Sequence, residues 1–276
     1  GLSGTMHSPQ IFGHADINNG SYVSDLDTVP VTATVATVTF NRRTVTLAKF
    51  RGYFGTGTIA ATGDLSFAQG FGERGDVSYA FHAVASGAQV NLPAYGSGAI
   101  DGTADLVRTP PGLAKLTGAA TLNNGSIPFA AFLGDSSAAA TTSSRPPVNV
   151  ALGMKVTAGK NVRIRGGGYG AGLDIGASGE AALGGTLAAP TLDGKFVSTG
   201  GTLTYFDRAF TMQSGSVTFT PSEGIVPELK AVAVTHVLNP DTDTNRNPYG
   251  TTDVTIAVTG RLPNPTVHLD STPAGY

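Results

Sequence analysis

The sequence predicts an all-β protein built from repeated short strands, on three observations. Apolar and polar residues alternate in runs of roughly 6–10 residues that Gly, Pro or Asp bound, a pattern typical of half-buried strands joined by turns. One spacing of Gly and Pro recurs along the chain. Helix signals are nearly absent, because the single candidate, residues 128–133, is long enough for at most one helical turn.

The recurring spacing is Gly-Thr, then a Pro four residues after the Thr, a Gly four after that and another Gly seven on. It occurs at Gly4-Thr5, Pro9, Gly13 and Gly20, and again at Gly185-Thr186, Pro190, Gly194 and Gly201. A second echo joins Ile17-Asn18-Asn19-Gly20-Ser21 with Leu122-Asn123-Asn124-Gly125-Ser126. A unit that repeats in this way predicts stacked short strands, with each Gly or Pro at a turn.

In the N-terminal half, alternation predicts strands over residues 31–40, 44–50, 58–67, 71–85 and 98–107. Within the first of these runs the apolar residues move from odd to even positions after Val35. Because strand side chains alternate between faces, this shift predicts a bulge or a strand that is apolar on both faces.

Residues 135–147, DSSAAATTSSRPP, have the lowest complexity in the chain and predict a linker or long loop. The linker divides the chain into an N-terminal segment of β-repeats, residues 1–134, and a C-terminal β-domain, residues 148–276. In the second part, alternation predicts strands over residues 148–156 and 162–165 and a glycine-rich segment after them, residues 166–172. Residues 229–237 and 254–258 predict a hairpin with a long polar tip.

Composition excludes several classes of protein. A net charge of -2 spread over both signs offers no basic surface, so we expect no nucleic-acid partner. The chain has no Cys, which excludes disulfides, thiolate metal sites and Cys nucleophiles. No apolar run reaches the ~18–20 residues that cross a bilayer, and no signal peptide is recognisable. Because the chain begins at Gly1 within a repeat, we expect a targeting or anchoring segment upstream.

Motifs for catalysis are absent from the sequence, so we expect neither an enzyme nor a cofactor. There is no G-x-S-x-G elbow, H-E-x-x-H helix or P-loop. His7 and His14 could approach each other across a hairpin, but surface histidines without a metal are the favoured interpretation. Residues 241–245, DTDTN, begin like a Ca²⁺ loop. Arg246 replaces the required glycine and Thr252 the bidentate Glu, which favours a solvated hairpin tip.

One apolar face is the strongest functional signal from the residues themselves. Strands such as 254–258 alternate aliphatic residues with Thr, Ser or Ala, which predicts a sheet with one apolar and one wet face. If the apolar faces line one open trough, the trough would accept acyl chains; the alternative is a closed sandwich or β-helix core. Arg163, Arg165 and the glycines that follow could cradle a phosphate, or could form an outward cationic face before a turn.

The C-terminal half, residues 148–273, carries a series of motifs in a defined order. They are Val162-Arg163-Ile164-Arg165-Gly166, Gly185-Thr186 to Pro190, Gly194, Gly201-Thr202-Leu203-Thr204-Tyr205, Phe210, Gly215-Ser216-Val217-Thr218-Phe219, Pro227-Glu228-Leu229, and the closing run from Val254 through Gly260 to Pro265 with Ser271 and Pro273. In order and spacing this region resembles the C-terminal region of the TamB family, AsmA-like translocation and assembly modules of Gram-negative-type envelopes.

The resemblance implies an elongated β-sheet curled into a β-taco, an open β-groove with a hydrophobic interior. It implies a periplasmic protein anchored in the inner membrane and paired with an outer-membrane barrel of the TamA or BamA type. The chain stops where the family continues into a segment that engages the barrel, which puts docking by this chain in doubt. The implied activity is passive phospholipid transport between membranes, or the assembly and secretion of outer-membrane proteins.

Twelve apolar residues are the candidates for contact with acyl chains. They are Val162, Ile164, Leu203, Tyr205, Phe210, Val217, Phe219, Val232, Val234, Val254, Ile256 and Val258. The competing interpretation is a structural or adhesive β-solenoid, whose closed core would use the same residues for packing and would carry no lipid.

Overall fold

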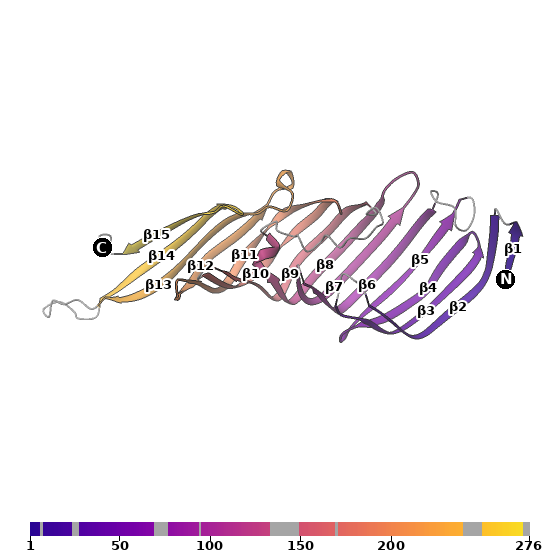
Figure 1. The fold of residues 1–276 in the computed structure, drawn as a ribbon, viewed down its shortest axis with the longest axis horizontal. Helices are drawn as coiled ribbons and strands as arrows, with labels where there is room; N and C mark the ends of the chain where they lie inside the picture. Colours follow the sequence, from indigo (N-terminus) through magenta and orange to yellow (C-terminus); the bar gives the residue numbers. More distant parts are fainter. Residues whose placement is uncertain are drawn as a thin grey trace.

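A computed structural model describes residues 1–5, 8–23, 28–68, 77–93, 95–132, 149–168, 171–239 and 250–272. Strands make up 83% of it and helix 3%, and all fifteen strands belong to one sheet that does not close into a barrel. In Figure 1 the molecule is elongated, with the strands oblique to its long axis and the two termini at opposite ends. The prediction of an all-β, open and curled sheet is confirmed.

Strand order in the sheet follows sequence order throughout. The first eight strands are β1 (Leu2–Thr5), β2 (Ser8–Tyr22), β3 (Val31–Arg42), β4 (Thr44–Phe54), β5 (Gly57–Phe67), β6 (Val77–Leu92), β7 (Gly96–Arg108) and β8 (Ala114–Pro128). The others are β9 (Val150–Gly168), β10 (Ala171–Thr186), β11 (Ala189–Tyr205), β12 (Arg208–Phe219), β13 (Glu228–Asn239), β14 (Gly250–Arg261) and β15 (Thr266–Thr272). The described residues also include two short 3-10 helices, η1 (Phe129–Phe132) and η3 (Pro221–Glu223), which are not part of the sheet.

The strands are longer than the short strands that the sequence predicts. β9 runs for 19 residues through a region where alternation predicts two separate strands. Of the recurring spacing, Gly-Thr and Pro do flank a hairpin turn, but Gly194 and Gly201 lie inside β11. Gly201 adopts φ +140°, and a Cβ there would come within 2.3 Å of the Asp174 carbonyl oxygen. These glycines therefore permit a close approach between strands rather than a turn.

The Asn-Asn-Gly echo is a bulge within long strands, not a turn between short ones. Asn19, Asn124 and Asn161 all have positive φ, near +50°, which Asn adopts more readily than most residues. Register shifts accompany them, between Ile17 and Gly20 in β2 and between Leu122 and Ser126 in β8. Because each bulge bends its strand, bulges in neighbouring strands help to curl the sheet.

Side-chain amides and a carboxylate link the bulges of adjacent strands. Asp101 accepts hydrogen bonds from the Gly87 N–H at 2.8 Å and from Asn123 Nδ2 at 2.9 Å. Asn123 Oδ1 in turn accepts from the Lys160 N–H at 2.9 Å, and Asn161 Nδ2 donates to Asn124 Oδ1 at 3.1 Å. These contacts satisfy polar groups that the bulges remove from the strand ladder, and we call them the bend ladder.

Neighbouring strands are antiparallel, with the exception of β8 and β9, which pair in parallel from Ala114↔Val150 to Pro128↔Arg165. The strands on the two sides of the predicted linker therefore belong to one sheet. After β8 the chain forms η1, which confirms the predicted helical turn. The predicted linker, residues 135–147, lies outside the described residues, as do His7 and residues 241–245. β13 and β14 form the predicted hairpin.

Candidate functional site

The inner face of the sheet is defined here as the face that carries its largest buried side chains. At its C-terminal end Phe210, Met212, Ala233 and Ile256 form one cluster, with exposed fractions of 8% or less. Leu203, Tyr205, Val254 and Val258 pack around this cluster, half-buried. Cross-strand pairing explains the arrangement, because Met212, Ala233 and Ile256 lie directly opposite one another on β12, β13 and β14.

Four further candidates reach the inner face through their pairing partners. Ile164 lies opposite Ile175, which packs against the cluster, and Val162, two residues earlier in β9, lies opposite Ala177. In β12, Val217 and Phe219 follow Gly215, which lies opposite Ala231 on the inner face of β13. Val162 and Phe219 are almost fully buried, at 2% and 3% exposed.

Val232 and Val234 lie on the opposite face, which we call the outer face. Val232 pairs with Ala257 and Val234 with Thr255, whereas the inner-face residues of β14 are even-numbered. The sequence of β13 here is Ala-Val-Ala-Val, so both faces are apolar and alternation gives no indication of which side turns inward. The structure thus brings together ten of the twelve candidate residues and separates these two from them.

The apolar inner face continues through the N-terminal strands, where the sequence identified no candidate. Residues that lie directly opposite one another form a row across β3 to β9, namely Val38, Leu47, Gly63, Phe81, Leu106, Leu116 and Leu152. The side chains of this row are half-buried. The alternation of apolar and polar residues in the N-terminal strands could have indicated this row. The twelve candidate residues, however, all lie in the region of the family resemblance, residues 148–273.

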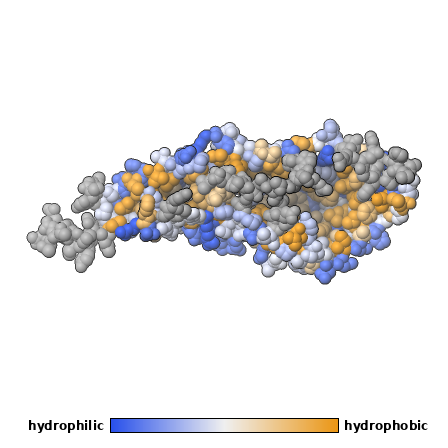
Figure 2. Space-filling model, viewed as in Figure 1, coloured by the Kyte–Doolittle hydropathy of each residue, from blue (hydrophilic) through white to orange (hydrophobic). Residues whose placement is uncertain are grey.

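The row runs across the strands, from one strand to the next along the sheet. At the C-terminal edge, Leu269 and Val267 of β15 extend the inner face opposite Ile256 and Val258, and each is about half exposed, at 48% and 49%. Figure 2 shows apolar residues, in orange, gathered along the visible face between margins where hydrophilic residues, in blue, are frequent. An elongated apolar surface of this kind can receive alkyl chains.

Several charged side chains of the outer face form ion pairs. His82 Nδ1 lies 2.7 Å from Asp105 Oδ1, and Lys155 Nζ lies 2.7 Å from Glu180 Oε2. Among the residues that the structure describes, no group of three or more His, Asp or Glu side chains could hold a metal ion. The outer face thus differs from the inner one in chemistry as well as in orientation.

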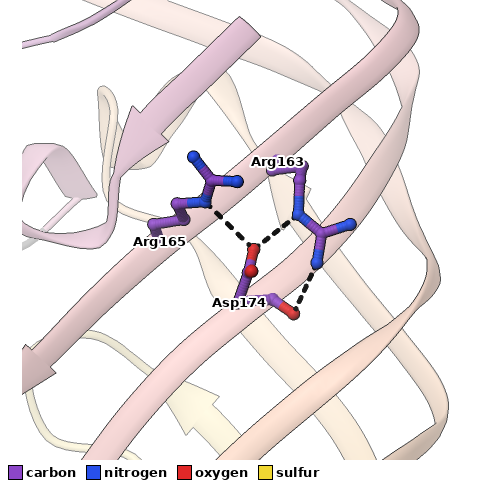
Figure 3. Close-up of polar contacts among 3 residues, drawn as sticks. All are labelled: Arg163, Arg165 and Asp174. Atoms are coloured by element: carbon purple, nitrogen blue, oxygen red, sulfur yellow. Dashed lines mark hydrogen bonds and ion pairs between the residues drawn. The ribbon is translucent and has the colours of Figure 1, made fainter. Parts of the chain in front are cut away.

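Arg163 and Arg165 form an ion-pair cluster with Asp174 on the outer face of β9 and β10 (Figure 3). Arg163 Nε and Arg165 Nε both donate to Asp174 Oδ1, at 2.5 and 3.2 Å. The hydrogen bond from Arg163 lowers the pKa of the Asp174 carboxyl, with a smaller effect from Arg165. The same bond raises the pKa of the Arg163 guanidinium.

This geometry favours the outward cationic face over the phosphate cradle. Both guanidinium groups already bind a carboxylate, and Gly166 to Gly168 are strand residues opposite β10 rather than a loop that presents free N–H groups. Gly166 has a different role. A Cβ at this position would lie 2.6 Å from the Phe129 Cβ, so the absence of a side chain lets η1 approach the inner face.

Comparison with known proteins agrees with this architecture. The family model of the TamB C-terminal domain matches residues 48–275, a span that starts a hundred residues before the resemblance apparent from the motifs. No curated protein matches the chain. In the described part of the chain, no helix has the length and apolar character needed to cross a membrane. With one open curled sheet, an apolar inner face and a match over most of its length, the chain belongs to the TamB family of envelope translocation and assembly modules.

Proposed function

We propose that the inner face carries phospholipid acyl chains between the inner and outer membranes and thereby serves outer-membrane assembly and secretion. The family acts in envelope protein and lipid transport and works with outer-membrane assembly components. In this proposal the protein acts in the periplasm, and its partner is a barrel of the TamA or BamA type. The acyl chains contact the N-terminal row and those of the ten inner-face candidates whose side chains are only half-buried.

The observation that carries the proposal is the continuity of apolar side chains along the inner face. Each CH₂ group that leaves water for this face gains about 0.8 kcal/mol, so a lipid tail on it avoids the cost of crossing an aqueous gap. No covalent chemistry is needed, because lipid can move down a gradient of chemical potential. The half-buried side chains of the N-terminal row leave apolar surface available for such contacts.

A structural or adhesive solenoid with a closed core has less support. The sheet joins neighbouring strands in sequence order and stays open, whereas a solenoid encloses its core between stacked coils. If the protein is instead a scaffold that binds no lipid, the following experiment will detect no lipid adducts.

The test compares two valines on adjacent strands that face opposite sides. Val258 points inward and Val232 outward. A photo-crosslinking amino acid with a diazirine group replaces each valine in turn, and the protein is expressed in bacteria and exported to the cell envelope. The samples are irradiated and then analysed by mass spectrometry for phospholipid adducts. We expect adducts at position 258 and at least tenfold fewer at position 232. Folded protein without adducts at position 258, or with equal adducts at both, would refute the proposal.

A further inference from the structure

The helical turn η1 lies on the inner face, between β9 and β12. Phe129, its first residue, sits against Gly166 of β9, as the 2.6 Å separation of their Cβ positions shows. Phe132, its last residue, contacts the ring of Phe219 in β12, with centroids 6.2 Å apart. Figure 1 shows this short coil near the middle of the molecule, among β9, β10 and β11. η1 thus crosses the apolar face on which we propose that lipid moves.

Beneath η1 the inner face is closed by aromatic side chains. Phe219 is 3% exposed and packs edge-to-face on Phe196 of β11, with centroids 6.1 Å apart. Phe132 contacts Phe219 from the side of η1. An acyl chain that follows the inner face past β10 and β11 would compete with Phe132 for the same surface.

η1 is held loosely enough to move. It has only four residues, and none of them is buried. A helical turn of this length has little stability of its own, so its position depends on the contacts at Gly166 and Phe219. Both contacts are apolar, and an acyl chain could replace them with contacts of the same kind.

We propose that η1 is a gate inside the groove, and this inference rests on the proposed lipid-carrying function. In the closed state Phe132 rests on Phe219, and acyl chains are excluded from the inner face beneath it. In the open state η1 leaves this surface and an acyl chain takes its place, which joins the N-terminal row to the C-terminal cluster in one path. Gly166 is the residue that permits the closed state.

The test uses a reversible lock. The chain has no Cys, so the bond between positions 129 and 166 is the one intramolecular disulfide available to the double variant Phe129→Cys/Gly166→Cys. Disulfides need Cβ atoms about 3.5–4.5 Å apart, which a shift of roughly 1 Å in η1 provides. A diazirine amino acid at Val217, beside Phe219 on the inner face, reports lipid beneath the gate. The same probe at Val258, in a parallel sample, reports lipid at a distance from it.

The purified variants are incubated with phosphatidylethanolamine and phosphatidylglycerol vesicles and irradiated in the oxidised and reduced forms. We expect the ratio of adducts at position 217 to those at position 258 to be at least threefold higher after reduction. An equal ratio in the two forms, with adducts at position 258, would overturn the gate and leave the lipid function intact. Absence of adducts at both positions in both forms would overturn the lipid function and the gate with it.

A second pair of variants covers the case in which the double variant does not fold. Gly166→Ala adds a Cβ that collides with Phe129 and should displace η1, raising the same adduct ratio at least twofold. Gly172→Ala is the matched control, because its Cβ would meet Thr204 at 3.4 Å, an ordinary contact. A ratio that stays unchanged in Gly166→Ala would contradict the gate.

Discussion

The two ends of the sheet share one pattern of strands but bury their apolar side chains to different degrees. In β12 to β14, Phe210, Met212 and Ile256 are at most 8% exposed and form a cluster. In β2 to β8 the described buried apolar side chains are small, with Val31 the largest, while Phe81 and Leu106 are only half-buried. The C-terminal end therefore resembles a protein core, and the N-terminal end leaves its apolar surface accessible.

This difference shows how one sheet can be both stable and available to a ligand. A groove that was sealed along its whole length would have no surface to offer. A groove that was exposed along its whole length would lack the packing that outweighs chain entropy. Here the clustered end supplies packing and the accessible row supplies surface. The following predictions test that division, beginning with the largest effect.

A charge should be far more damaging in the cluster than in the row. Ile256→Glu places a carboxylate among Phe210, Met212 and Ala233, and we expect it to lower the free energy of unfolding by about 4 kcal/mol or more. Phe81→Glu leaves the carboxylate able to reach water and should cost only about 1–2 kcal/mol. Urea unfolding followed by circular dichroism measures both values.

Thr255→Lys is the control for the first substitution, since Thr255 neighbours Ile256 on the outer face and lies opposite Asp270, so a charge there should be tolerated within about 0.5 kcal/mol. Equal losses for Ile256→Glu and Phe81→Glu would contradict the division into a clustered and an accessible end. Lipid adducts measured in the folded Phe81→Glu protein then report on the row itself, and we expect fewer of them.

The asparagines of the bulges should contribute more where they take part in the bend ladder than at the start of the sheet. Asn123→Ala removes hydrogen bonds to Asp101 and to the Lys160 N–H and should cost about 1–2 kcal/mol. Asn18→Ala, at the equivalent position of the first echo, affects an exposed side chain and should cost less than about 0.5 kcal/mol. Thermal unfolding compares the two variants, and similar losses would mean that the contacts around Asn123 have no special role in holding the curl.

The smallest expected effect concerns Asp174, whose pKa is lowered in the folded protein by Arg163 and Arg165. A lowered carboxyl pKa stabilises the fold above the unfolded value of about 4, and that contribution disappears as the pH falls through the folded value. Asp174→Asn should therefore reduce the melting temperature slightly at pH 7 and not at about pH 2. Because the cluster is exposed, added salt should shrink the difference. A difference that persists at acid pH would indicate a cause other than charge.

Alternation and turn residues were sufficient to predict the all-β class, most strands, the final hairpin and the helical turn before residue 133, whereas the open, curled form of the sheet followed from the family resemblance. They could not predict strand length, because Asn-Gly and isolated Gly serve both tight turns and mid-strand bulges. The parallel pairing of β8 with β9 could not be predicted either, because the relative direction of two strands is not encoded in the residue pattern of either strand.

The candidate site was predicted in part, for related reasons. Phe210 and Ile256 are recognisable as inner-face residues because each is a large apolar residue between an Ala and a Thr. The Ala-Val-Ala-Val run of β13 instead hides the orientation of Val232 and Val234. Met212 and Ala233 were missed although they lie in the centre of the cluster. The role of Gly166 depends on a contact with η1 that only the three-dimensional arrangement reveals.

Strand order that follows sequence order has a consequence for size. Neighbouring strands lie about 4.8 Å apart, so each additional hairpin would lengthen the sheet by roughly 10 Å. A hairpin with the same alternation would preserve the distinction between the faces, whereas a single residue inserted within a strand would reverse the faces beyond it. Evolution can therefore change the length of such a protein in steps of one hairpin, without altering the chemistry of the surface that faces the groove.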